Sequence, residues 1–210
     1  MTGGFAGWPV GAFGVLLELE GEPSAEVRRR CRRDREELVR QPMVDLLNVV
    51  ADADSAYEDF AVWRYGEVLL EAWQRQSAIV RLGRNVELTV RFDLDGLEVG
   101  VAWWYAPSDQ IERYRAAVAD LATGERLARI VRKLEREEFD ISGDLLKRPL
   151  RGYPPDHPRA QLLRLRSVVA RRHLGCDDWI HTPAAADRVI DAFSQLRPLA
   201  RWLVENVSRP

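Results

Sequence analysis

The chain has few of the residues from which common sites are built. Its 210 residues include only two cysteines, three histidines and two lysines. Cys31 and Cys176 lie far apart in the sequence, and they show neither the spacing of a zinc site nor the density of a disulfide scaffold. We therefore expect no metal site, and we expect both thiols to stay reduced, as is typical of a cytoplasmic protein.

Long apolar runs are also missing. No stretch approaches the roughly 18 consecutive apolar residues of a membrane-spanning helix. The first residues, Met1 to Phe13, have no cationic segment ahead of an apolar core. The sequence therefore predicts neither a membrane span nor a secretory signal.

A strong excess of charge of either sign is missing as well. The formal net charge is −2 and the pI is about 6.0. A protein that binds nucleic acid is more often strongly basic. The composition therefore argues against a nucleic-acid partner and leaves a local basic patch open.

Complete catalytic and cofactor motifs are absent. The sequence contains no Walker loop, no G-x-G-x-x-G, no H-E-x-x-H, no C-x-x-C and no G-x-S-x-G. We therefore expect no cofactor, and whether the protein is an enzyme stays open. One group of residues offers metal ligands or a Cys/His nucleophile: His173, Cys176, Asp177, Asp178 and His181. The same group also fits a polar loop between two helices, which is the interpretation that we favour.

What the sequence does contain is a clear hairpin pattern. Apolar residues alternate from Val86 to Phe92 and again from Leu97 to Trp103, with Asp95-Gly96 between the two runs. Alternation has the period of a strand with one buried face, and Asp-Gly is a strong turn signal. The pattern predicts an antiparallel hairpin with its turn at Asp95-Gly96, inside a meander over residues 59–105.

Helical patterns flank this sheet, over residues 10–52 before it and 108–208 after it. The predicted fold class is therefore α+β: a single domain, residues 1–210, in which an antiparallel β-sheet meander is covered by N- and C-terminal α-helices. Pro42 should kink or split the first long helix. Gly124 should separate two later helices, and Arg159–Arg172 should form another.

The least ordinary run is a proline-rich crossing, Leu146–Arg159. Its prolines exclude a helix interior or a central strand, so we expect an extended surface segment. The candidate ligand-binding residues are cations and one aromatic residue, namely Lys147, Arg148, Arg151 and Tyr153 in the crossing and Arg64 outside it. Arginine offers a planar fork for phosphate or carboxylate. The alternative is that these cations form salt bridges to the protein itself.

His157 in the crossing is the candidate acid/base residue. A catalytic role would need a second titratable group in the same pocket. The structural alternative is that its ring packs and bonds to the backbone, holding the crossing in place. Both roles stay open, and we favour the structural one.

Two stretches of the chain resemble one family. Phe5-Ala6-Gly7-Trp8-Pro9 resembles the F-x-G-[FW]-P opening of a widespread bacterial group, the domain-of-unknown-function family 2461. Leu146 to Pro158 is similar to that family's L-K-x-x-P-x-G-[FY]-x-x-x-H-P signature, and Leu196-Arg197-Pro198-Leu199 continues the likeness. The resemblance covers nearly the whole chain and supports the fold and cellular context more than a chemistry.

The chain departs from the family at its first strand. The family usually has a stretch like Y-R-D-T-R-F-[ST]-K-D-K-x-P-Y-K, where this chain has Trp63 to Trp73. Of that ionisable run, only Arg64 clearly survives. Any activity or anion site that the family carries there would be altered in this protein.

Three functions are compatible with these observations. The first is a binding protein for an anionic small molecule or a phosphate-bearing partner, held by the cations of the crossing. The second is an enzyme with His157 as general base and Lys147, Arg148 or Arg64 stabilising negative charge. The third is a scaffold for a protein partner, which requires an exposed aromatic surface. Its candidate residues are Trp63, Trp73, Trp103, Trp104 and Tyr105. The alternative, which we favour for the tryptophans, is that they belong to the buried core. The sequence leaves the oligomeric state open.

Overall fold

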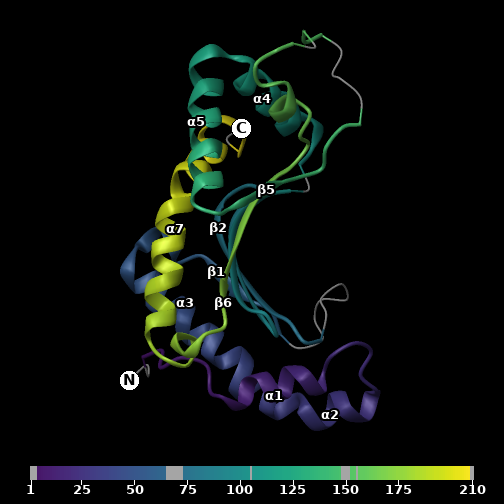
Figure 1. Ribbon diagram of the computed structural model, residues 1–210, viewed down its shortest axis with the longest axis vertical. Coiled ribbons are helices and arrows are strands. Elements are labelled where there is room, and N and C mark those ends of the chain that lie inside the picture. Colours follow the sequence, from purple (N-terminus) through teal and green to yellow (C-terminus); the bar gives the residue numbers. More distant parts are fainter. Residues whose placement is uncertain (1–3, 65–72, 105, 148–151, 155, 209–210) are drawn as a thin grey trace. The chain divides into compact units, whose positions relative to one another are not determined.

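The computed structural model describes residues 4–64, 73–104, 106–147, 152–154 and 156–208. Its strands form one antiparallel sheet in the order β1-β2-β3-β4-β6-β5 (Figure 1). The strands are β1 (Phe60–Val62), β2 (Gln76–Gly83), β3 (Val86–Asp93), β4 (Gly96–Trp103), β5 (Asp140–Ser142) and β6 (Val168–Gly175). The predicted α+β fold with an antiparallel sheet is confirmed.

Helices precede and follow the first four strands in the sequence. The α-helices are α1 (Gly11–Glu18), α2 (Ala25–Asp34), α3 (Gln41–Ala53), α4 (Ser108–Ala119), α5 (Leu121–Arg136), α6 (Ala160–Leu163) and α7 (Ala184–Leu203). Among the helices that the structure describes, none is long and apolar enough to cross a membrane.

Contacts between Cα atoms divide the chain into two compact units. Unit 1 comprises Met1–Val80, Thr89–Val99 and His173–Ala192. Unit 2 comprises Arg81–Leu88, Gly100–Arg172 and Phe193–Pro210. Strands β2, β3, β4 and β6 and helix α7 each contribute residues to both units. That the chain behaves as a single domain stays a prediction.

An aromatic cluster fills the core of unit 1. The ring of Trp8 stacks on that of Phe92 in β3, with 4.5 Å between centroids, and Phe13 of α1 meets Phe92 edge-on at 5.2 Å. Such pairs contribute about 0.5–1.5 kcal/mol beyond their burial. Trp8 Nε1 donates to the carbonyl of Val39 at 3.1 Å, so the buried indole leaves no unpaired donor. The cluster fastens the start of the chain to the sheet.

Gly7 makes this attachment possible. Its φ is +100°, and a Cβ at this position would overlap the backbone of His181 and Thr182. The main-chain N–H of Trp8 donates to Ile180 at 3.0 Å, and His181 Nδ1 lies 2.7 Å from the carbonyl of Trp8. The close approach therefore requires glycine.

A second aromatic cluster fills the core of unit 2. Tyr114 of α4 packs against Trp103 of β4 at 4.9 Å and against Trp202 of α7 at 6.0 Å. Gln110, fully buried, accepts from Trp103 Nε1 at 3.0 Å. Trp202 Nε1 donates to the carbonyl of Thr123 at 2.9 Å. Each buried polar atom of these indoles thus has a partner, as buried polar groups require.

The predicted break at Pro42 takes the form of a π-helical turn over Arg35–Arg40, between α2 and α3. Proline has no N–H, so Pro42 cannot bond the carbonyl of Leu38 as an α-helix would require. The helix widens before Pro42, which sits in the first turn of α3. The sequence predicted a kink or a split, and the structure shows a π-helical turn inside a helical run that continues without interruption from residue 25 to residue 53.

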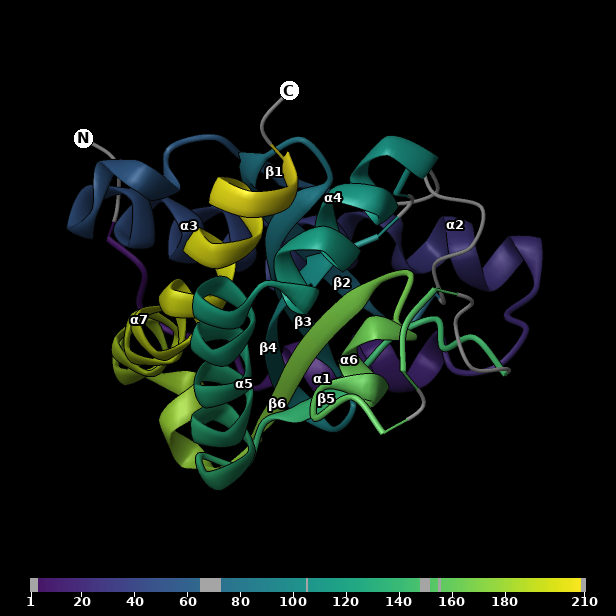
Figure 2. The same cartoon turned by 90° about the horizontal axis from the view of Figure 1, so that it is seen from above.

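Two strands lie where the sequence predicted helix or connection. Val168–Gly175 forms β6, so the prediction of a helix over Arg159–Arg172 is wrong beyond α6 (Figure 2). Asp140–Ser142 forms β5 and pairs with β6, with Ile141 opposite Ala170. Leucines at helical spacing suggested a continuous helix, but Val168 and Ala170 alternate with less buried residues, as in a strand.

Two turn predictions shift by a few residues. The hairpin turn consists of Leu94 and Asp95, one position earlier than predicted, and Gly96 opens β4 with φ +96°. Leu88 and Val90 are buried, as expected. Gly124 does not end a helix. It lies inside α5, whose N-terminal cap is Asp120.

Candidate functional site

The residues predicted to bind an anion are distributed between the two units. Arg64 is exposed and belongs to unit 1, whereas Lys147 and Tyr153 belong to unit 2. Arg148 and Arg151 lie outside the described residues. Whether these side chains converge on one anion stays a prediction.

His157 holds a turn in the crossing. Its Nδ1 accepts from the main-chain N–H of Arg159 at 3.1 Å, and the main-chain N–H of His157 donates to the carbonyl of Pro154 at 3.1 Å. Its carbonyl accepts from Ala160 at 2.9 Å. These bonds are those of the structural alternative. A catalytic role for His157 stays a prediction.

Arg159, which sequence reasoning did not single out, anchors the end of the crossing in unit 2. Only 6% of the residue is exposed. Its guanidinium donates to the carbonyls of Val118 at 2.7 Å and Ala119 at 3.0 Å, and it pairs with Glu125 at 2.8 Å. A Cβ on Gly124 would overlap this guanidinium, which explains a glycine inside α5. Gly124 was the one residue whose type could have indicated a close contact at this position of α5.

The aromatic residues of the scaffold hypothesis differ in exposure. Trp103 is fully buried and therefore cannot form part of a docking surface. Trp63 and Trp73 are half-buried, Trp104 is 36% exposed, and Tyr105 lies outside the described residues. The described residues thus offer a smaller aromatic surface than the hypothesis required.

A compact group of charged side chains lies at one end of the sheet in unit 1. We call it the ion cluster. Its members come from the residue before β2, the end of β3, the start of β4 and the end of β6: Arg75, Arg91, Asp93, Glu98 and His173. Neighbouring antiparallel strands run in opposite directions, so the end of one strand lies beside the start of the next at the same end of the sheet.

Arg91 joins the two carboxylates of the ion cluster. Its Nε lies 3.0 Å from Asp93 Oδ2, and its Nη2 donates to Glu98 Oε2 at 3.0 Å. The side chains of Asp93 and Glu98 are only 12% and 9% exposed. A buried carboxylate is stable only when it is paired. Arg91 supplies that pairing for both and is held in one orientation by it.

The other two cations lie at the solvent side of the ion cluster. His173 Nε2 lies 3.0 Å from Glu98 Oε2, and the His173 side chain is 58% exposed. Arg75 Nε lies 3.8 Å from Asp93 Oδ2, and its side chain is 37% exposed. The buried carboxylates therefore position two cations whose outer edges face water.

A buried arginine fixes the segment that carries Arg75. Arg35, in the π-helical turn, donates to the carbonyls of Trp73 at 3.3 Å and of Arg75, and to Gln76 Oε1 at 2.9 Å. Gln76 in turn donates to the carbonyl of Trp63 at 2.9 Å. These bonds hold the main chain at Arg75 before any ligand arrives, which lowers the entropic cost of binding.

The sequence offered little signal for the ion cluster. Its residues come from four separate segments, and they meet only through the pairing of β3, β4 and β6, a pairing that the predicted helix over Arg159–Arg172 excluded. The alternation in β3 places Arg91 and Asp93 on one face of the strand, but nothing in that pattern indicates which charged residues of other strands lie beside them.

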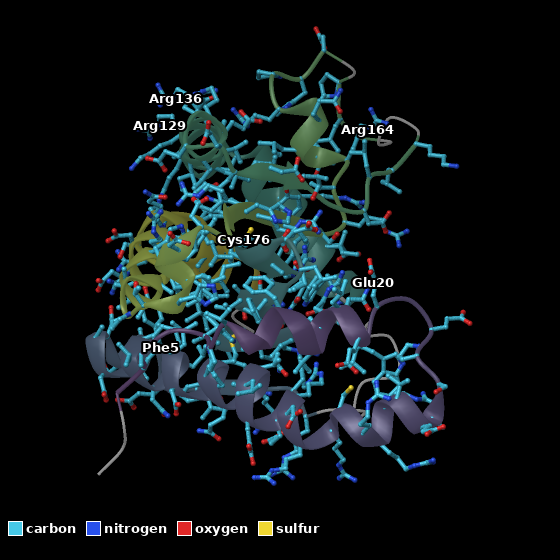
Figure 3. The ribbon with its side chains drawn as sticks, turned by 60° about the horizontal axis from the view of Figure 1, so that its bottom comes forward. Phe5, Glu20, Arg129, Arg136, Arg164 and Cys176 are labelled. Carbon is cyan, nitrogen blue, oxygen red and sulfur yellow. The ribbon has the colours of Figure 1, made fainter. Side chains whose placement is uncertain are left out.

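Two histidines of the loop group around Cys176 contact different partners. His173 pairs with Glu98, whereas His181 bonds the carbonyl of Trp8. Figure 3 labels Cys176, which is exposed. Over the described ranges, no three His, Cys, Asp or Glu side chains are grouped so that they could hold a metal ion.

Comparison with known proteins identifies the family. A model of the family described as "conserved hypothetical protein (DUF2461)" matches residues 75–202, well over half of the chain. The matched range includes every member of the ion cluster and the C-terminal signature, whereas the Phe5–Pro9 opening precedes it. The search of curated proteins finds no match. The resemblance noted from the sequence is thus confirmed, and the chain belongs to the DUF2461 family.

Proposed function

We propose that the protein binds a small anionic molecule at the ion cluster and that Arg75 makes the principal contact with the anion. The binding of an anion was the function that the sequence favoured. The residues are different: the cations of the ion cluster contact described carboxylates, whereas Arg148 and Arg151 of the crossing lie outside the described residues.

The observation that carries this proposal is the incomplete pairing of Arg75. Among the described residues, its one ion-pair contact is to Asp93 at 3.8 Å, which is too long for a hydrogen bond. Its Nε is buried and has no hydrogen-bond partner among these residues. An arginine whose backbone is held in place and whose Nε donor is unused is suited to an oxyanion.

The geometry favours a planar or tetrahedral oxyanion. A guanidinium presents parallel N–H donors that match carboxylate, phosphate or sulfate oxygens in pairs. His173 supplies a further donor edge in the same cluster when its ring is protonated. Asp93 and Glu98 lie behind the cations and are already paired, so they orient the site more than they repel the ligand.

Sulfate is a suitable probe because it has the charge and the oxygen geometry of a phosphate group. Sodium sulfate is titrated into ¹⁵N-labelled protein at constant ionic strength, with sodium chloride as the reference salt. We expect saturable shifts at the N–H groups of Arg75, Asp93 and Glu98. In Arg75→Gln, we expect the sulfate affinity to fall by about tenfold or more, since hydrogen bonds to charged groups are worth about 1.5–3 kcal/mol.

Arg33→Gln is the matched control. Arg33 is an exposed arginine of α2, also in unit 1, which pairs with Glu37 at 2.8 Å. Its substitution changes the net charge of the protein equally but should leave sulfate binding unaltered. Equal losses of affinity in Arg33→Gln and Arg75→Gln would reduce the effect to general electrostatics and overturn the proposal.

A further inference from the structure

We infer that His173 couples the binding of the anion to the uptake of a proton. This inference rests on the proposed function and concerns the same site. It follows from the charges of the ion cluster. Two guanidinium groups, Arg75 and Arg91, face two carboxylates, Asp93 and Glu98, so these four groups cancel. The protonation of His173 therefore decides whether the ion cluster is neutral or carries one positive charge.

The hydrogen bond between His173 and Glu98 determines which ring nitrogen titrates. A carboxylate held by Arg91 is an acceptor only, so His173 Nε2, which lies 3.0 Å from Glu98 Oε2, carries a hydrogen in both ring states. Nδ1 is then the atom that gains or loses the proton. It has no hydrogen-bond partner in the part of the chain that the structure describes. The new N–H thus forms at the exposed edge of the ring.

The charged residues around His173 support the view that its proton determines the net charge of the ion cluster. Glu98 of β4 contacts the ring directly, and Arg91 of β3 contacts Glu98 and also Asp93. On β6 itself, Arg171 stands two residues before His173 and pairs with Asp140 of β5 at 3.9 Å. Each of these neighbouring charges already has a partner of opposite sign. The proton on His173 is therefore the charge of the ion cluster that an incoming anion balances.

Thermodynamic linkage sets the direction of the effect. If the anion binds more tightly to the protonated ring, then the bound anion must raise the proton affinity of the ring by the same factor. Anion affinity should therefore rise as the pH falls from about 8.5 to about 5.5, by about tenfold for one added charge within a few ångströms of the ligand.

The test uses sulfate, which does not itself titrate in this pH range. Isothermal titration calorimetry from about pH 5.5 to about pH 8.5 gives the dissociation constant at each pH. Two buffers with different heats of ionisation give the number of protons taken up. For the wild type we expect about a tenfold loss of affinity towards the alkaline end and the uptake of up to one proton near neutral pH.

His173→Gln is the decisive variant, because glutamine keeps a donor for Glu98 but cannot titrate. We expect this variant to bind sulfate with an affinity that does not change with pH and without proton uptake. His157→Gln is the matched control, since it removes a half-buried histidine of unit 2 and should retain the wild-type pH dependence. A pH dependence retained in His173→Gln, or lost in His157→Gln, overturns the inference.

Glu98→Gln tests the charge count from the other side. It removes one negative charge and leaves an acceptor for His173, so the ion cluster becomes positive even with a neutral ring. We expect its affinity at about pH 8.5 to approach that of the wild type at about pH 5.5. A lower affinity than the wild type at alkaline pH contradicts the charge count.

The two proposals fail in different ways. Sulfate binding that is lost in Arg75→Gln but unaffected by pH overturns this inference and leaves the proposed function intact. The absence of sulfate binding at the lowest pH overturns both.

Discussion

Cys31 and Cys176 occupy opposite environments. Cys31 is buried in α2, and its Sγ donates to Glu18 Oε2 at 3.5 Å, whereas Cys176 is exposed after β6. Burial, with a further contribution from Glu18, raises the pKa of the Cys31 thiol. A thiolate is the reactive form of cysteine, so a raised pKa and burial both slow its alkylation.

We therefore predict that iodoacetamide at neutral pH labels only Cys176 of the folded protein. After unfolding in urea without a reductant, both thiols should be labelled, because both are free. Intact-mass spectrometry counts the labels. Cys176→Ser is the control and should take up no label until it is unfolded. A folded protein that gains two labels, or an unfolded protein that gains none, contradicts the prediction.

The clustering of cations in the sequence did not identify the residues of the ion cluster. The crossing attracted attention because its cations are adjacent in sequence. Arg159, its last cation, is instead committed to backbone carbonyls of unit 2. Arg75 stands between two glutamines, with no charged neighbour to mark it, and the sequence grouped His173 with the loop that follows it, not with Glu98. What gives them significance is the pairing of strands, which a single sequence does not display.

At the scale of elements, the β3–β4 hairpin makes the sharpest prediction. Gly96 has φ +96°, and a Cβ there would overlap the carbonyl of Gly175. A β-branched residue resists positive φ. Gly96→Val should therefore lower the free energy of unfolding by about 2 kcal/mol or more, as measured by urea denaturation.

Gly14→Val is the matched control for Gly96→Val. Gly14 lies on the exposed side of α1, and no atom stands within 4 Å of its added Cβ. Valine is a better helix former than glycine, so this change should leave stability unchanged or slightly higher. Equal stability of the two variants would show that the conformation at Gly96 is not required.

Elements with a local signal were predicted well, and those that depend on distant partners were not. The alternation of β3 and β4 and the irregularity at Pro42 both follow from neighbouring residues. β6 is different, because its leucine-rich approach suggests a helix and its place beside β4 comes from the rest of the fold. Gly124 resembled a helix break because the guanidinium that fills its open side comes from Arg159.

Helix α5 shows which of its features follow from nearby residues. Leu127, Val131 and Leu134 are buried along one side, at the spacing typical of a helix with one apolar face. Arg129 and Arg136 point away from the helix (Figure 3). Helical periodicity thus accounts for which residues are buried, while the cap at Asp120, which accepts from Ala122 and Thr123, sets where the helix begins.

At the scale of the whole molecule, continuous elements argue for cooperative unfolding. Four strands and α7 supply residues to both compact units, so neither unit can lose these elements without affecting the other. We predict one transition in urea, with the same midpoint by far-ultraviolet circular dichroism and by tryptophan fluorescence. Coincident transitions are the standard test of two-state behaviour.

Tryptophan substitutions test whether the two units unfold together in this experiment. Trp8 reports on unit 1 and Trp202 on unit 2, and both are buried. Trp8→Phe lowers the share of the fluorescence that comes from unit 1, and Trp202→Phe lowers the share from unit 2, while the six other tryptophans remain in each variant. Each variant should still show a fluorescence midpoint equal to its own circular dichroism midpoint. Two separated midpoints in either variant would mean that the chain consists of two domains.

The π-helical turn over Arg35–Arg40 has a consequence for how this protein can evolve. A helix turns by about 100° per residue, so the loss or gain of one codon here would rotate α2 relative to α3 by that angle. The carbonyl of Val39 would move away from the indole of Trp8, and Arg35 would leave the carbonyls that it binds. Natural variation between Ser24 and Pro42 should therefore proceed by substitution, with the number of residues conserved.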